Sequence, residues 1–102
     1  MQLMEFGQFT NVIIPEKIKE LTKLDINKPE YQETSISVEN IDKTTDEITT
    51  YSGIIMIKRD SFPLYILNYS YRVEDNNESC SMSIKETFYE FLEHFNLPYV
   101  SD

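Results

Sequence analysis

A nine-residue stretch of strict alternation constrains the fold more than any other feature of this sequence. From residue 65 to residue 73 every second residue is apolar. The apolar set is Tyr65, Leu67, Tyr69, Tyr71 and Val73. A period of two residues is typical of a β-strand, because successive side chains point to opposite faces of a sheet. This stretch therefore predicts a strand with one apolar face, and the chain must also supply a sheet and a layer that covers that face.

Two further strands are indicated before it. Ile36 and Val38 alternate with polar residues from Glu33 onward, which predicts a half-exposed strand. Residues 42–46 are polar and have hairpin length, so they predict a turn. Residues 47–58 are rich in β-branched and aromatic residues with apolar groups on both faces, which favours a central strand. Residues 59–61 form the next predicted turn, so the three strands are expected to form a meander.

The remaining segments favour helices. Pro15 and Glu16 suit the first turn of a short helix over residues 15–24, whereas residues 3–14 could form a strand or irregular chain. Residues 74–79 are predicted to be a polar turn. After it, Ser83 and Glu86 have the spacing of a capping box. The apolar residues that follow stack on one side of a predicted C-terminal helix, with Phe91 expected to be buried; they are Ile84, Phe88, Phe91, Leu92 and Phe95.

Together these elements predict one fold class. We expect an α+β fold in which an antiparallel meander of three to four strands packs against a C-terminal amphipathic helix, with a short N-terminal helix. The 102 residues match the common size of one domain, so residues 1–102 are expected to form a single domain. An apolar content of 40% is enough to form a core.

Charge and composition exclude several classes of function. The formal net charge is −9, so direct binding to nucleic acid through phosphate contacts is not expected. Apolar segments are interrupted by charges too often to span a membrane, and the first nine residues lack the pattern of a signal peptide. The single cysteine, Cys80, excludes a disulfide scaffold and fits a reducing compartment. A cytoplasmic protein is expected.

Catalytic and metal-binding patterns receive little support. The one histidine, His94, falls near the end of the predicted last helix, and neither His94 nor Cys80 has an evident catalytic partner. Zinc would need four such ligands. Asp75, Asn77, Ser79 and Glu86 match part of a calcium-loop spacing, but Cys80 stands where that loop needs glycine. The sequence therefore predicts no enzyme, no metal site and no cofactor.

The acidic residues are unevenly distributed. Up to Pro29 the chain is neutral, and the remaining 73 residues carry the whole net charge. Two groups of carboxylates are candidate contacts for a partner, one near the first hairpin and one from the second turn into the last helix. They are Asp42, Asp46 and Glu47, and then Glu74, Asp75, Glu78, Glu90 and Glu93. Such a surface either keeps the protein soluble or binds a basic partner.

The C-terminal segment supports a different hypothesis. Residues 84–100, with the sequence IKETFYEFLEHFNLPYV, follow a strand meander. In pattern, the last two thirds of the chain resemble the SecB-type chaperones, which have an antiparallel sheet followed by helices and a Leu-Pro segment. The arginine and the preceding helix of that family are absent here, and the chain is short for it. The resemblance implies that unfolded or partner polypeptides would be held on an apolar groove.

Three functional hypotheses follow. The leading one is a small acidic inhibitor or masking protein of the phage or mobile-element type. It would bind a basic protein, such as a nucleic-acid-binding protein, as a mimic of nucleic acid. The second is a SecB-like chaperone, and the third is a structural component of a larger assembly. Charge-driven binding weakens steeply with salt and apolar capture does not, so salt dependence separates the first two.

Overall fold

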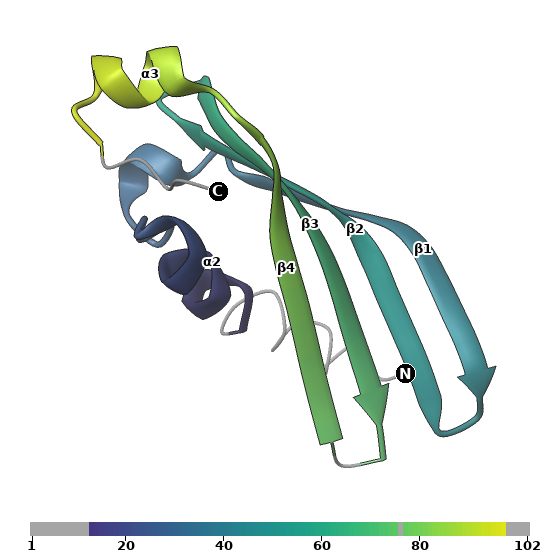
Figure 1. Cartoon of the computed structure of the whole chain (residues 1–102). Helices are drawn as coiled ribbons and strands as arrows, with labels where there is room; N and C mark the ends of the chain where they lie inside the picture. The colour runs from purple at the N-terminus through teal and green to yellow at the C-terminus, as the bar shows by residue number, and fades with distance from the viewer. Residues whose placement is uncertain (1–12, 76, 98–102) are drawn as a thin grey trace.

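Four antiparallel strands form one sheet in which spatial order follows sequence order (Figure 1). The computed structural model describes residues 13–75 and 77–97. The strands are β1 (Ser35–Thr45), β2 (Ile48–Arg59), β3 (Phe62–Glu74) and β4 (Asn77–Thr87). β2 and β3 are central, and β1 and β4 lie at the edges. The central place of β2 is the one that its apolar groups on both faces predict.

In the part of the chain that the structure describes, three short helices accompany the sheet. They are α2 (Ile14–Thr22), the 3-10 helix η2 (Pro29–Tyr31) and α3 (Tyr89–His94). α2 confirms the predicted N-terminal helix: Pro15 lies in its first turn, and it ends at Lys23, whose φ of 68° is left-handed. The segment before it lies outside the described residues as far as residue 12. In the described part of the chain, no helix is long and apolar enough to cross a membrane.

The predicted fold class is confirmed, but the last helix begins later than its pattern indicates. Ser83 and Glu86 do not form a capping box, because both lie in β4 opposite Asn68 and Ile66. The prediction is wrong here because residues 80–84 also alternate with a period of two, and β3 offers them a complete backbone ladder. Only the last turn and a half of the predicted helix forms, as α3, which packs on the end of the sheet.

The turns are shorter than the polar stretches that predict them. Residues 42–45 belong to β1, which leaves only Asp46 and Glu47 in the first turn. Of the polar turn predicted over residues 74–79, residues 77–79 belong to β4 and residue 74 belongs to β3. The turn between β2 and β3 is Asp60 and Ser61, both with positive φ (48° and 75°), as in a two-residue hairpin turn. Polar residues are tolerated in these strand ends because their side chains are exposed.

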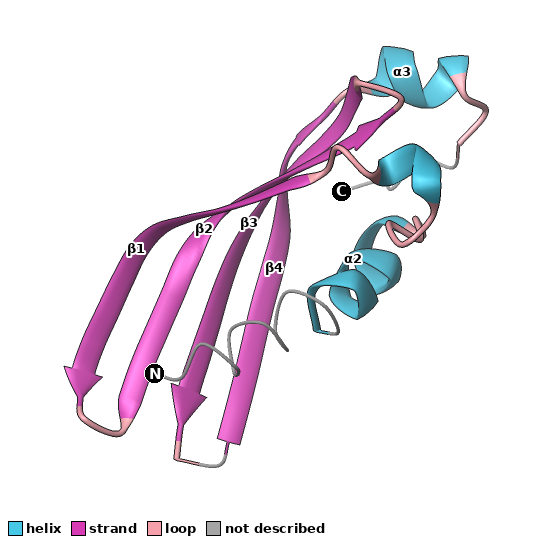
Figure 2. Cartoon of the chain, turned by 180° about the vertical axis from the view of Figure 1, so that it is seen from behind, coloured by secondary structure: helices cyan, strands magenta, loops and turns pink. Residues whose placement is uncertain are grey.

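The core lies on one face of the sheet, which we call the tyrosine face. β3 contributes the predicted alternating residues, all buried except the half-buried Val73. Residues of β2 and β4 lie directly opposite them; the set is Tyr51, Ile55 and Ile57 of β2 and Cys80, Met82 and Ile84 of β4. α2 packs against this face with Ile14 and Ile18 fully buried, and Figure 2 shows it beside the sheet.

Gly53 is the point at which β1 approaches the centre of the sheet. A methyl group at Gly53 would lie 1.9 Å from the carbonyl oxygen of Ser37. Across this gap the Tyr69 hydroxyl of β3 donates a hydrogen bond of 2.8 Å to the same Ser37 oxygen. Tyr69 thus spans β2 and connects two strands that are not neighbours. Only glycine leaves room for this contact.

Arg59 is the last residue of β2, at the end of the sheet that is far from the β1–β2 turn. There it connects the helices to the sheet. Its guanidinium carbon lies 4.7 Å from the centre of the Phe95 ring and 6.0 Å from the centre of the Tyr31 ring. The backbone N–H of Phe88 donates to the Leu64 carbonyl, and Leu92 of α3 is fully buried. Cation–π contacts of this kind hold η2 and the segment after α3 against the end of β2.

Candidate functional site

Six of the eight predicted partner-binding carboxylates come together at one end of the sheet. Asp46 and Glu47 form the β1–β2 turn, and Glu74 and Asp75 lie at the β3–β4 turn. Asp42 and Glu78 lie on the adjoining strand ends, and all six are exposed. We call these six residues the hairpin-tip patch: Asp42, Asp46, Glu47, Glu74, Asp75 and Glu78.

The meander topology brings the two turns together. In a sheet of order 1-2-3-4, the first and third turns must lie at the same end, as Figure 1 shows. Ile48, next to the first turn, is directly opposite Glu74. The backbone N–H of Asp75 also donates a 3.2 Å hydrogen bond to the Glu47 carbonyl. The two acidic turns therefore form one continuous surface, although Glu47 and Glu74 are 27 positions apart in the sequence.

Negative charge predominates in the hairpin-tip patch. The structure describes one ion pair in it, between Arg72 and Glu74 at 3.2 Å, with both side chains about half exposed. Two further cations lie nearby: Lys43 of β1 is opposite Thr49, and Lys17 of α2 lines a pocket together with Glu78. Because these charges are exposed, their mutual repulsion is screened by water and salt and costs little stability. The patch can instead attract a cationic surface over a distance of about one Debye length.

Glu90 and Glu93 are separated from this patch. Both are exposed on α3, at the other end of a molecule that extends 47 Å along its longest axis. The sequence suggests a continuous acidic run from the polar turn predicted over residues 74–79 into the last helix. In the structure, β4 is an extended strand that separates the acidic turn from the acidic residues of α3. The convergence of the two turns could have been found from the meander prediction, since alternate turns of a meander share an end.

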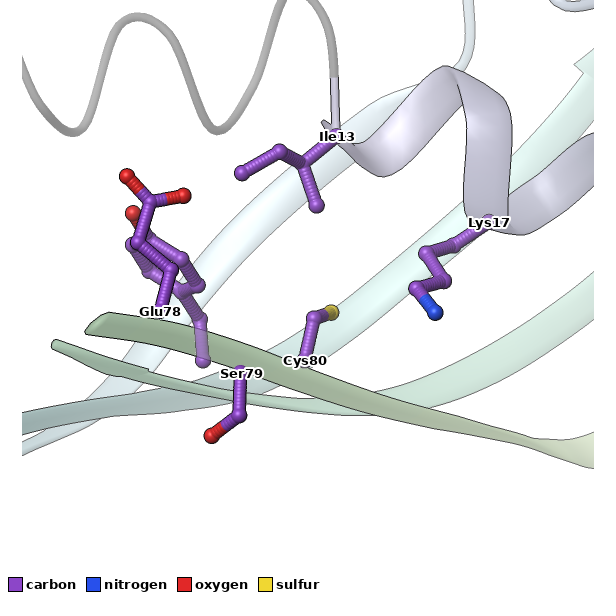
Figure 3. Close-up of a pocket in the computed structure, with 6 residues that line it drawn as sticks. Ile13, Lys17, Glu78, Ser79 and Cys80 are labelled. Carbon is purple, nitrogen blue, oxygen red and sulfur yellow. The ribbon is translucent and has the colours of Figure 1, made fainter.

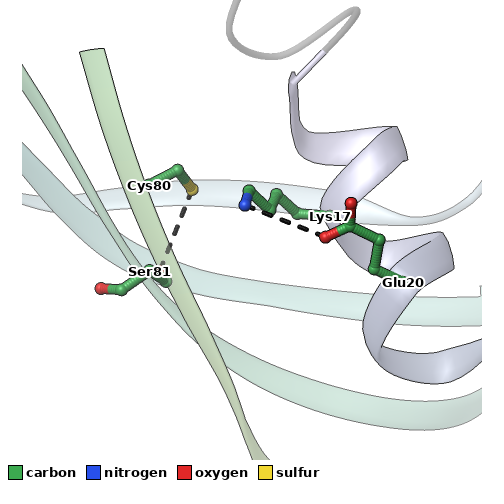
Figure 4. Close-up of polar contacts among 4 residues, drawn as sticks. All are labelled: Lys17, Glu20, Cys80 and Ser81. Atoms are coloured by element: carbon green, nitrogen blue, oxygen red, sulfur yellow. Dashed lines mark hydrogen bonds and ion pairs between the residues drawn. The ribbon is translucent and has the colours of Figure 1, made fainter. Parts of the chain in front are cut away.

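A shallow pocket between α2 and β4 contains the only thiol. Figure 3 shows Ile13 and Lys17 from the helix side above Glu78, Ser79 and Cys80 of β4, and Tyr71 also lines it. Burial raises the pKa of Cys80, and the nearby Lys17 lowers it by a smaller amount. In Figure 4 the Lys17 ammonium group pairs with Glu20 at 3.9 Å. The thiol thus stays protonated at neutral pH, which is the opposite of what a nucleophilic cysteine needs.

The other chemistry-bearing residues do not assemble with Cys80. His94 lies on α3 at the far end of the sheet, 4.9 Å from Phe95 and 6.2 Å from Phe62 between ring centres. The residues that match part of the calcium-loop spacing do not come together around one point. Asn77 and Glu86 are nine residues apart along β4, or roughly 30 Å of extended chain. Among the described residues, no group of three or more His, Cys, Asp or Glu side chains could hold a metal ion.

Three titratable groups with raised pKa values are expected to make the stability of the protein fall at alkaline pH. Burial raises the pKa of both Tyr69 and Tyr31 above 10.0, although Arg59 partly offsets the effect at Tyr31, and burial raises the pKa of Cys80 above 9.0. The folded protein then keeps protons that the unfolded chain releases. We expect a free energy of unfolding that does not depend on these three groups below about pH 8 and falls as the pH rises through about 9 to 11.

Urea denaturation at a series of pH values measures this fall. The Y69F and C80S substitutions each remove one of the groups, so each is expected to flatten the alkaline part of the curve, whatever its effect at neutral pH. An unchanged slope in the double variant would show that these two groups are not the cause.

Comparisons with protein-family models, with curated proteins and with solved structures find no match to this chain. The candidate site therefore rests on its own geometry and charge.

Proposed function

We propose that this protein is a binding module that attaches to a basic surface of a partner protein through the hairpin-tip patch. The observation that carries the proposal is the convergence of two acidic turns, linked by the hydrogen bond between Asp75 and Glu47, on one projecting end of the sheet. In this proposal the protein acts as an inhibitor or masking protein of the phage or mobile-element type. The carboxylates would occupy the partner's Lys and Arg side chains as nucleic-acid phosphates do.

The form of the patch supports this kind of partner. Its six carboxylates are exposed, and the structure describes only one of them, Glu74, in an ion pair. Neighbouring strands are about 4.8 Å apart, so two adjacent turns place several carboxylates within reach of one basic surface. Charges of this kind act mainly by steering the encounter, and they favour cationic partners over anionic ones. The proposal includes a cytoplasmic location, for which the single thiol is the support.

Charge reversal in the patch is expected to weaken binding without unfolding the protein. The test variant is E47K/E78K, which changes one carboxylate from each hairpin. Exposed charges contribute less than about 1 kcal/mol each, so the melting temperature should change little. The association rate with the partner should fall roughly tenfold at low ionic strength, and the rate should depend less on salt. The partner is first recovered by a pulldown at low salt, and its binding is then measured by surface plasmon resonance.

The chain offers a matched control for this experiment. E90K/E93K makes the same chemical change and the same change in net charge, but at the other end of the molecule. It should keep most of the association rate. Equal losses in both variants would assign the effect to overall charge, and no loss in E47K/E78K would remove the patch from the binding surface.

A second proposal is chaperone-like capture of extended polypeptides. The observation that favours it is the edge strand β1, on which Val38 and Ile41 are exposed. A captured segment would add a strand to this edge through main-chain hydrogen bonds. The binding of a reduced, unfolded model substrate, at an affinity that high salt does not weaken, would support it over the first proposal.

A further inference from the structure

We draw no further inference here: the strongest candidate, the open outer edge of β1 on which Val38 and Ile41 are exposed, is interrupted by two register shifts, and nothing in the described part of the chain shows what covers it.

Discussion

Replacing Gly53 by alanine is expected to unfold the protein at room temperature or leave it barely stable. The added methyl group would lie 1.9 Å from the Ser37 carbonyl oxygen and 3.0 Å from the Tyr69 hydroxyl. The nearest atom belongs to the backbone, so it cannot rotate away as a side chain could. β1 would have to move out, and the hydrogen bond between Tyr69 and Ser37 would break. We expect a loss of about 3 kcal/mol or more, a large part of the stability of a small domain.

Urea denaturation followed by circular dichroism measures this loss. The matched control is S52A, at the neighbouring position of β2, because Ser52 lies opposite Asn40 and Ser70 on the other face of the sheet. That substitution should cost less than about 1 kcal/mol. A G53A protein with a wild-type transition would show that β1 does not approach the sheet as closely as the structure places it.

Leu92→Ala is expected to destabilise the protein more than Phe91→Ala. The helical stripe predicts a buried Phe91, but that residue is only half-buried. Its ring stacks on Phe62, 4.9 Å away between ring centres, and Phe62 is itself 42% exposed. Leu92 is fully buried, and its carbonyl accepts a hydrogen bond from the N–H of Leu97. We expect a loss of about 2 to 5 kcal/mol for L92A and about half as much for F91A.

Thermal denaturation of both variants, with the enthalpy of unfolding, distinguishes the two positions. The physical reason for the order is that a cavity forms only where the surrounding atoms cannot move in, and water can reach the Phe91 site. The reverse order, with F91A the less stable variant, would mean that α3 is rotated on the end of the sheet relative to its position in the structure.

The elements that were predicted correctly are those whose local pattern and tertiary environment agree. β3 alternates over nine residues and lies in the centre of the sheet, so its period of two matches its burial. β2 carries apolar groups on both faces and pairs on both sides. α2 has Pro15 in its first turn and Ile14 and Ile18 on one side, and these two side chains are buried against the sheet.

β4 shows where local pattern is insufficient. Residues 80–84 alternate like a strand, and the overlapping apolar spacing from Ile84 to Phe95 is that of a helix. Neither pattern is long enough to exclude the other. The strand forms because β3 presents a matching ladder, with Cys80, Met82 and Ile84 opposite Tyr71, Tyr69 and Leu67. That ladder belongs to β3, so the choice between strand and helix depends on residues outside the local pattern.

For the candidate site as well, the local sequence decided some properties and the tertiary structure decided others. The sequence by itself determined that the protein would be acidic, that its carboxylates would gather near the polar turns and in the last helix, and that an antiparallel meander would form. These properties depend on composition and on periods of a few residues. Only the tertiary structure decided that Glu47 and Glu74 meet at one end while Glu90 and Glu93 lie at the other. It also decided that Ile41 is exposed on an open edge, because those relations depend on strand pairing between residues far apart in the chain.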